Sequence, residues 1–535
     1  MKNSELARVG GGALALMLVL TAGGCKAVGP SYERPTIATP EAWASELGVG
    51  LTARSMALEP GQQARWWTLL NDPVLTGLVD RAVAGNLDLK QASARVREAR
   101  ALRGVAGSGG RPTVDVGADY SRSAQSETSS RFSQGDGAGR DLFQGGFDAS
   151  WELDVFGGTR RNIEAADADV GAAQWARRDV LVTLIAETGR QYVELRTAQQ
   201  RLVIARQNVD SQRQTLGLTE NRLRAGLTSE LDVTRARSQL ATTQATIPLL
   251  EGQSAQAIYG LSVLCGQFPG ALAAELSAPA QIPMAVATGS SGVVSGVASV
   301  ALPTGVPMDL VRRRPDVRQA ERELAAATAR IGVATSELYP SFSLRGSIGL
   351  ASSQIGTLLE GNSRYWSIGP GVRWNILDFG RIRSSIDVQE ARTAFALAGY
   401  EGGVLRALRE VDSAIVGFTT GSARRVALSE AVSAQLRAVE LSTRLYREGL
   451  ADFISVLDTQ RQLLILQDQE AEAQGGVTLS LVQLYKSLGG GWEVELTAEQ
   501  AGGGAESAQR GTMAADGVVE EIKTPTSSTI DALVR

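Results

Sequence analysis

The sequence has 535 residues but contains no histidine and only two cysteines, Cys25 and Cys265. Without imidazole groups, the chain lacks Ser-His-Asp triads, Cys-His pairs, histidine general bases and histidine-ligated metals. Pairs of acidic residues occur, but none lies beside a glycine-rich phosphate loop or a cluster of metal ligands. We therefore expect no enzyme activity, no metal site and no cofactor. Because Cys25 has a separate use, described below, a structural disulfide is not expected either.

The chain also lacks a strong excess of charge of one sign. Its formal net charge is −4 and its isoelectric point is about 5.4, so no basic surface for nucleic acid is expected. The mean hydropathy of −0.04 excludes a bundle of membrane-spanning helices. It does not exclude a transmembrane β-barrel, because only every second residue of a barrel strand faces lipid.

Residues 1–24 have the features of a signal peptide. A weakly basic start precedes an apolar run over 13–20, which is about half the length that a spanning helix requires. Small residues then precede Cys25, in a pattern that resembles the bacterial lipobox, although Ala22 replaces the usual leucine. In such proteins the cysteine thiol is acylated and becomes the first residue of the mature chain. We expect lipidation at Cys25 and a lipid-anchored segment over 25–73; ordinary secretory cleavage just before this cysteine is the alternative.

The sequence contains an internal two-fold repeat. Trp151 and the six residues after it recur in similar form from Trp374, which is 223 residues later. The Arg-Ala-Gly-Leu run at 224–227 recurs as Arg-Glu-Gly-Leu at the same offset, while Asp88 and Asp316 belong to an upstream set of matches at an offset of 228. Two halves of equal layout are therefore present. The predicted segments are 74–268 for the first half, 269–305 for the linker, 306–490 for the second half, and 491–535 for an equatorial segment followed by a disordered tail.

Each half contains two segments in which apolar and polar residues alternate. From Phe147 to Val155 the odd positions are apolar, while acidic residues and a serine occupy the even positions. This period predicts a strand with one apolar and one polar face, of about the length that crosses a bilayer. A soluble sandwich would also alternate, but acidic residues between aromatic ones favour a barrel with a wet lumen. Pro370 would remove a ladder hydrogen bond and marks a bulge or bend. The strands are expected over about 113–122, 146–156, 341–351 and 364–378.

Each Phe-Gly motif is followed by a long run that is poor in glycine and proline. Apolar residues recur there every seven positions, which predicts coiled-coil packing. The run from Arg160 to Ala225 alone would form roughly 100 Å of helix. Pro248 should kink the returning helix of the first half. The helices are expected over about 159–225, 228–265, 381–448 and 451–488. The seven-residue grid includes Leu181, Leu195, Leu202, Val209, Leu216 and Leu223 in the first half, and Val404, Val411, Phe418, Val432, Val439 and Tyr446 in the second.

Four strands per chain cannot close into a barrel. An open sheet edge in lipid leaves unpaired backbone groups, and each of them is costly. Two copies would give eight strands with an interior filled by side chains. Three copies would give twelve strands with a wider bore, continued by a ring of twelve long helices. The strand count permits the trimer without requiring it.

Several short motifs occur together in one known family. They are Trp66-Trp67 with Asn71-Asp72-Pro73, the seven residues from Trp151 and from Trp374, the runs 313–318 and 337–342, and the two Gly-Leu turns. In combination they resemble the TolC/OprM-like outer-membrane efflux channels, in particular the NodT-type lipoproteins, over about 25–492. The resemblance implies an α+β membrane protein. It would be a homotrimer with a twelve-stranded transmembrane β-barrel, a long periplasmic α-helical coiled-coil barrel and a mixed α/β equatorial region.

The resemblance also implies the place of the protein in the cell. It would be located in the cell outer membrane, lipid-anchored and projecting into the periplasm. Its partners would be a periplasmic adaptor protein, an inner-membrane pump of the RND type and outer-membrane lipid. Gly226, Leu227, Gly449 and Leu450 match the family's tip loops, which contact the adaptor. A plain turn is the alternative reading of these residues, because glycine tolerates the positive φ that a tight turn requires.

Three further residues match the family's periplasmic gate. Asp232 and Tyr446 have the spacing of an aspartate–tyrosine pair that holds the inner helices closed. Asp458 matches a lumen-facing acidic ring, which would favour cations at the constriction. Ala451 and Ser455 stand where the family's prototype has an arginine and a second aspartate, so we expect fewer ionic links and a contribution from a hydrophobic constriction. Solvated charge on helix surfaces is the alternative.

The expected function is therefore that of a passive exit duct for small molecules, such as drugs and toxic compounds, delivered by a pump and an adaptor. One alternative is a lipid-anchored coiled-coil scaffold or adhesin without a channel, in which the alternation in four segments would be a coincidence. Another is an outer-membrane duct for protein secretion or metal efflux. The sequence of a duct does not identify the cargo, because the pump selects it.

Overall fold

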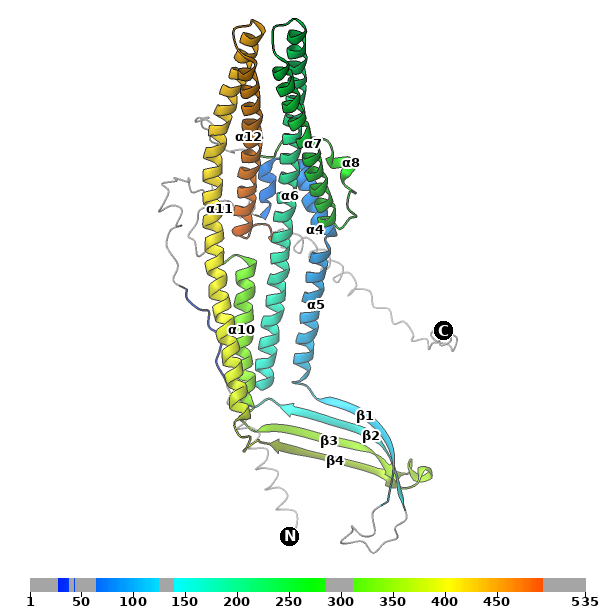
Figure 1. Ribbon diagram of the computed structural model, residues 1–535. Coiled ribbons are helices and arrows are strands. Elements are labelled where there is room, and N and C mark those ends of the chain that lie inside the picture. The colour runs from blue at the N-terminus through cyan, green and yellow to red at the C-terminus, as the bar shows by residue number, and fades with distance from the viewer. Residues whose placement is uncertain (1–26, 38–42, 44–63, 125–138, 285–310, 494–535) are drawn as a thin grey trace, which may run out of the picture.

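The computed structural model describes residues 27–37, 43, 64–124, 139–284 and 311–493. Long helices lie side by side, and a curved sheet extends from one end of them (Figure 1). The first half contains α4 (Pro73–Gly85), α5 (Leu87–Ser108), β1 (Thr113–Ser123), β2 (Arg140–Leu153), α6 (Gly158–Arg224) and α7 (Glu230–Leu264). The second contains α10 (Pro315–Ser336), β3 (Ser341–Ser352), β4 (Arg364–Arg373), α11 (Arg381–Arg447) and α12 (Phe453–Ser487). The short elements are η1 (Trp66–Leu70), α8 (Ala273–Leu276), η2 (Ile355–Thr357) and η3 (Gly361–Ser363).

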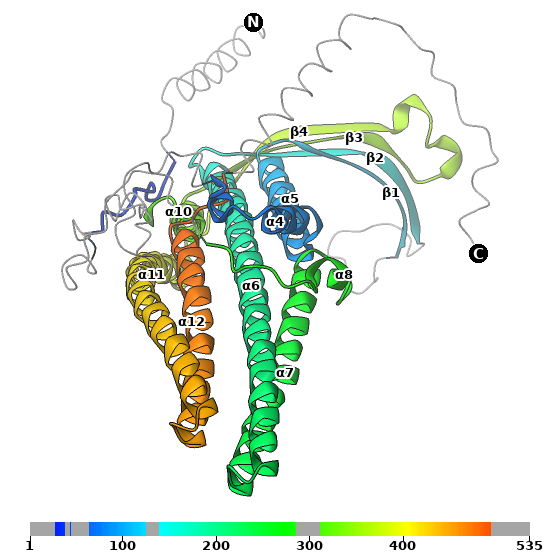
Figure 2. The same ribbon diagram turned by 90° about the horizontal axis from the view of Figure 1, so that it is seen from above.

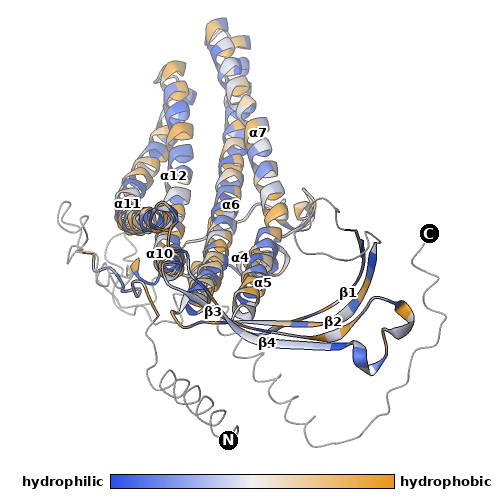
Figure 3. Cartoon of the chain, turned by 90° about the horizontal axis from the view of Figure 1, so that it is seen from below, coloured by the Kyte–Doolittle hydropathy of each residue, from blue (hydrophilic) through white to orange (hydrophobic). Residues whose placement is uncertain are grey.

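The four strands form one antiparallel sheet in the order β1-β2-β3-β4. One row of paired residues across the sheet is apolar and exposed, and consists of Val116, Phe147, Ile348 and Trp366. The next row is polar and consists of Asp115, Asp148, Ser347 and Ser367. Because neighbouring residues of a strand point to opposite faces, the sheet has one apolar and one polar face. This confirms the alternation predicted from the sequence; Figure 3 shows polar and apolar residues interleaved along the strands.

Two strands differ in extent from the sequence prediction. β2 begins at Arg140, six residues before the predicted start, because the ladder with β1 continues as far as Ser123. β2 and β4 end at Leu153 and Arg373 rather than at 156 and 378. Just beyond each end, the carboxylate of Asp154 or Asp378 accepts hydrogen bonds from backbone N–H groups in the first turn of the following long helix. The first N–H groups of a helix have no partner within the helix, and these aspartates provide one. Capping of the helix therefore replaces strand pairing here, and the strands end earlier than predicted.

The long helices follow the predicted pattern closely, and their ends lie within two residues of the predicted bounds. α6 and α11 each contain 67 residues, which corresponds to roughly 100 Å. Most residues on the seven-residue grid are buried, which confirms the predicted packing, among them Leu181, Leu195, Leu202, Val209, Val404, Val411, Phe418, Val432 and Tyr446. Pro248 lies inside α7 without ending it. Within the described ranges, no helix combines the length and apolarity needed to cross a membrane.

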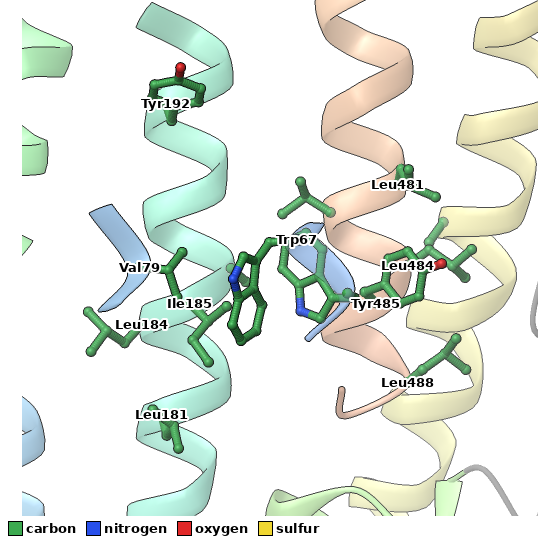
Figure 4. Packing of buried hydrophobic residues seen from close by; sticks show 14 of the residues in the cluster. Trp67, Val79, Leu181, Leu184, Ile185, Tyr192, Leu481, Leu484, Tyr485 and Leu488 are labelled. Atoms are coloured by element: carbon green, nitrogen blue, oxygen red, sulfur yellow. The ribbon is translucent and has the colours of Figure 1, made fainter. Parts of the chain in front are cut away.

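The helices lie beside one another as a single layer, which Figure 2 shows from above. Next to the sheet their order is α5-α6-α10-α11, and toward the distant turns it is α7-α6-α12-α11. The largest apolar core lies midway along this layer, at a level that we call the equator (Figure 4). There Trp66 stacks on Tyr485, with ring centroids 5.4 Å apart, and Trp67 packs beside it. Asp72 begins α4 by capping two backbone N–H groups, and it also accepts a hydrogen bond of 2.7 Å from the Tyr192 hydroxyl.

A row of glycines fixes the close approach of the strands on the polar face. Gly117, Gly146 and Gly349 lie opposite one another on β1, β2 and β3, and Tyr365 continues the row on β4. The Tyr365 ring lies over Gly349, and its hydroxyl accepts a hydrogen bond of 3.0 Å from Gln144 on β2. Tyr365 therefore reaches across β3 to β2, and the missing glycine side chains leave room for it.

We predict that Gly349→Ala destabilises the fold by about 2 kcal/mol, because the new Cβ would lie 2.5 Å from the Gly145 carbonyl oxygen and 2.9 Å from the Tyr365 ring. Gly369→Ala on β4 is the matched control, since nothing lies within 4 Å of its Cβ position, and a change below about 0.5 kcal/mol is expected. Urea unfolding of the detergent-refolded protein measures both. Equal stability of the two variants would show that the glycine row is not a packing constraint.

Candidate functional site

The two Gly-Leu turns form the ends of the helical layer furthest from the sheet (Figure 1). At the first turn, Gly226 adopts a φ of +73°, and its N–H and that of Leu227 donate to the carbonyl oxygens of Leu223 and Arg222. The second turn repeats this arrangement with Gly449, at a φ of +77°, and Leu450. These bonds satisfy carbonyl groups at a helix end, and glycine adopts the required positive φ without strain. The leucines are 64% and 72% exposed, so each turn presents an apolar side chain outward.

Asp232 lies one turn into α7 and closes its N-terminal cap. Its carboxylate accepts hydrogen bonds from the hydroxyls of Thr228 and Ser229, at 2.7 and 3.0 Å, while the Ser229 hydroxyl accepts from the Asp232 N–H. Partial burial raises the pKa of Asp232, but these hydrogen bonds outweigh that effect and hold the pKa below its ordinary value. The negative charge also lies at the positive end of the helix dipole.

Tyr446 lies at the same end of the molecule but does not meet the Asp232 carboxylate. Its hydroxyl is buried and has no hydrogen-bond partner among the described residues. The ring packs with Ala236 of α7 and Phe453 of α12, and the Arg222 guanidinium lies 4.7 Å from its centroid. The structure therefore brings Asp232 and Tyr446 to one end without the expected hydrogen bond; the Asp232 carboxylate bonds within the α7 cap instead.

Asp458, the third predicted gate residue, lies on the exposed side of α12, five residues after the first residue of that helix. The neighbouring face of α12 is buried through Phe453 and Val456. Asp458 thus points away from the small apolar cluster around Tyr446 and toward the surface of the chain. The predicted lipidation residue, Cys25, lies outside the described residues, and Cys265 is a free, buried thiol.

The residues just after Cys25 are held against the junction of strand and helix. We call residues 27–34 the strap. The Val28 N–H donates to the Phe156 carbonyl oxygen at 3.0 Å, and the buried Arg161 side chain donates to the carbonyl oxygens of Val28 and Gly29. Gly29 packs directly on Gly332 of α10, where a Cβ on either glycine would collide with the other segment. These contacts fix the strap beside the start of α6.

An ion pair with a buried carboxylate holds the other end of the strap. Arg34 donates through two nitrogens to Glu321 of α10, at distances of 2.7 to 3.0 Å. Burial raises the pKa of Glu321, but hydrogen bonds from Arg34 and Arg322 outweigh it, so the pKa lies below its ordinary value. A carboxylate of this kind stabilises the fold above its ordinary pKa and loses that contribution as the pH falls through the lowered pKa.

We therefore predict that acidification releases the strap in the wild-type chain. Glu321→Gln should release it at neutral pH as well, at a loss of roughly 2 kcal/mol, since charge-assisted hydrogen bonds are removed. Limited proteolysis within 27–34 as a function of pH measures the release. Glu323→Gln, on the exposed side of the same helix, is the control and should retain the wild-type profile. Protection of the Glu321→Gln strap at neutral pH would contradict the role of the ion pair.

One motif residue has a structural role that sequence reasoning missed. Arg314, within the run 313–318, is buried and donates to Asp316, to Glu410 of α11 and to the Ser487 carbonyl oxygen at the end of α12. It thereby joins α10, α11 and α12 at the equator. An arginine directly before a Pro-Asp helix start is a local signal for such a contact, but its partners are distant in sequence. Within the described residues, no group of three Cys, Asp or Glu side chains is placed to hold a metal ion.

Comparisons with known proteins agree with this architecture. A family model described as outer membrane efflux protein matches residues 78–267 and 306–490. The chain is 31% identical over 483 residues to the toluene efflux pump outer membrane protein TtgI of Pseudomonas putida, covering 90% of this chain and 98% of that protein. It is 30% identical over 450 residues to nodulation protein T of Rhizobium leguminosarum bv. trifolii, covering 84% and 91%. The solved structure of the outer-membrane channel OprN superposes with a TM-score of 0.78 at 35% identity, covering 87% and 99%.

Proposed function

Because this chain belongs to the outer membrane efflux protein family, it is the outer-membrane channel component of a tripartite efflux system, and we propose that three copies assemble to form its pore. The observation that carries the proposal is the incomplete sheet. β1 and β4 are both edge strands, and the four strands show an apolar face that the chain leaves exposed. In lipid, such edges must be paired. Joining β4 of one copy to β1 of the next gives a closed barrel of twelve strands with its polar face toward the lumen.

The two outer helices of the layer also support assembly into a trimer. α5 and α11 form its two edges near the sheet, and both carry exposed apolar residues: Leu102 and Val105 on α5, and Val388 and Phe395 on α11. Phe395, the most exposed of the four, is 83% exposed. Placing α11 of one protomer against α5 of the next covers these residues and closes the layer into a helical tunnel below the barrel.

The tips and the gate belong to the periplasmic end of this tunnel. Gly226-Leu227 and Gly449-Leu450 would contact a periplasmic adaptor, which joins the duct to an inner-membrane pump of the RND type. Asp458, exposed on α12, would form an acidic ring in the trimer and favour cations there. Asp232 and Tyr446 would belong to the same constriction, and Tyr446 would support it from within the protomer, where its hydroxyl is buried.

The permeants are small toxic compounds rather than proteins. A toluene efflux relative of similar length favours organic compounds. The cation efflux system protein CusC of Escherichia coli O157:H7, 28% identical over 487 residues, makes metal cations the second candidate. Both kinds of permeant are compatible with a passive duct whose selectivity comes from the pump.

The strap supports a lipid anchor at Cys25. Cys25 is three residues before Val28 in the sequence, and Val28 meets Phe156 at a fixed point of the fold. That point is the junction between the sheet and the long helices, which is the boundary of the membrane if the sheet lies in lipid. An acyl chain on Cys25 would enter the outer membrane there without displacing the strap.

A conductance measurement tests the proposed pore. The purified protein should conduct ions in planar bilayers, and Asp458→Asn should lower its cation preference severalfold, because the acidic ring would lose its charge. Asp210→Asn, an exposed aspartate on α6, is the control. Absence of conductance in the wild-type protein would contradict the channel, whereas an unchanged ion preference in Asp458→Asn would contradict only the acidic ring.

A separate prediction concerns the lipid anchor at Cys25. Cys25→Ser should abolish incorporation of radiolabelled palmitate, since the acylated thiol is absent, while barrel assembly survives. Cys265→Ala, which removes the other thiol of the chain, should leave labelling unchanged. Persisting palmitate on Cys25→Ser would refute lipidation at this residue.

A further inference from the structure

At the equator, other elements pack on one face of α6 and α12. On α6, Tyr192 donates a hydrogen bond to Asp72 in the α4 cap, and Gln199 donates to the Leu276 carbonyl oxygen in α8. On α12, the Thr478 hydroxyl donates to a backbone carbonyl oxygen of the segment that follows α8. These bonds define a covered face of the helical layer.

A groove of about 490 Å³ lies on the opposite face, over α6 and between α7 and α12. Arg190, Glu194 and Arg201 of α6 line this equatorial groove, and the helical period places them on the side of α6 away from Tyr192 and Gln199. Its volume is in the range that holds drug-sized molecules. The apolar part of its lining consists of small residues and one leucine: Ala198 of α6, Ala257 and Gly260 of α7, and Gly475, Gly476 and Leu479 of α12.

Glycines on α7 and α12 give the groove its depth. A Cβ on Gly260 would collide with the Gln191 amide, and one on Gly475 would collide with the Thr197 hydroxyl, so these two glycines make room for side chains of α6. Gly476 differs from them, because nothing lies within 4 Å of its Cβ position. A side chain at this position would therefore occupy the open space of the groove without displacing the protein.

Two guanidinium groups of the groove are held in place by carboxylates. Arg190 forms ion pairs with two glutamates of its own helix. Arg201 forms ion pairs with Asp468 and Glu472 of α12, at 2.6 and 2.9 Å. Because each guanidinium has two carboxylate partners, the groove has no excess positive charge to attract an anion. A guanidinium held through its N–H groups still presents its planar faces, which stack well on aromatic rings.

We propose that the equatorial groove binds aromatic compounds of one or two rings that carry no negative charge. The ring would lie on the small apolar residues with a guanidinium face against it. The amides of Gln253 and Gln256, which line the groove from α7, would bond to a polar substituent. This inference rests on the proposed function, because it gives the duct a binding site for its organic permeants.

In the proposed trimer the equatorial groove faces the lumen. Twelve helices side by side, at about 8–10 Å between axes, form a ring roughly 35 Å across. Three copies of α4 and α8, each about 10 Å thick, would obstruct such a ring from inside, so the face that they cover is the outer one. The groove lies on the other face, along the path of a permeant. Binding there must be weak enough to allow release.

The first test fills the groove. Gly476→Leu should lower the affinity for 1-naphthol roughly tenfold or more, because the leucine occupies the space of the ring. Gly217→Leu is the matched control, since its Cβ position is equally open and it lies on α6 outside the groove. Saturation-transfer NMR of the purified protein in lipid nanodiscs measures binding. Equal affinities of Gly476→Leu and the wild type, or no binding by the wild type, would overturn the proposal.

The second test concerns the chemical class of the ligand. Saturated decahydro-1-naphthol should bind more weakly than 1-naphthol because it has no aromatic face, and anionic 1-naphthalenesulfonate should bind more weakly because carboxylates neutralise both guanidiniums. Arg190→Lys and Arg201→Lys keep the charge but remove a planar face, so at least one of them should narrow the preference for the aromatic alcohol. An unchanged preference in both variants, or tighter binding of the sulfonate, would contradict the assigned class.

A third measurement tests whether the groove faces the lumen. Attachment of a polymer-linked maleimide to Gly476→Cys should reduce the current in planar bilayers. Attachment to Asp210→Cys, five helical turns after Tyr192 and thus on the covered side of α6, should not. Treated wild-type protein reports any effect of the reagent at the buried Cys265. An undiminished current of labelled Gly476→Cys would refute the lumenal position, whereas a protein that binds 1-naphthol but never conducts would contradict the proposed pore instead.

Discussion

The structure depends on one constraint, which is the incompleteness of the four-stranded sheet. Its register places most of the apolar side chains on one face, and its two outer strands have no partner within the described chain. An apolar face can be satisfied by lipid, but an unpaired strand edge in lipid cannot. We propose that further copies of the chain pair these edges, and the same neighbours would cover the exposed apolar residues on α5 and α11. The proposed barrel, tunnel and exit duct all follow from such a closure.

The helical layer is held together by different contacts along its length. At the equator, the Trp66–Tyr485 stack, the Tyr192–Asp72 hydrogen bond and the Arg314 contacts hold both hairpins to one apolar core. Toward the tips, the contact between the hairpins includes single polar bonds, such as the one from Asn208 to Gln467. The strap, fixed by Arg161 and by the Arg34–Glu321 pair, lies at the end of the layer next to the sheet.

The elements with a simple period could be predicted from the sequence. Alternation located the strands, the seven-residue repeat located the long helices within two residues, and the Gly-Leu pairs located the turns. α5 and α10 were not predicted as helices, because they precede the strands and lie outside the long runs that follow the Phe-Gly motifs. The strap could not be predicted, since its contacts join residues 133 and 287 positions apart. The Asp232 cap has a local signal in Ser229, three residues earlier, whereas the resemblance assigns Asp232 only to a gate pair.

The central claim is that the chain closes its sheet only with other copies of itself. Native mass spectrometry of the protein, extracted from membranes in mild detergent, measures the number of chains in the particle directly. The account predicts a single species with the mass of three mature chains, which dissociates only together with loss of the β-structure signal. A stable, folded species with the mass of one chain, whose β1 and β4 amides are protected from hydrogen exchange, would contradict it.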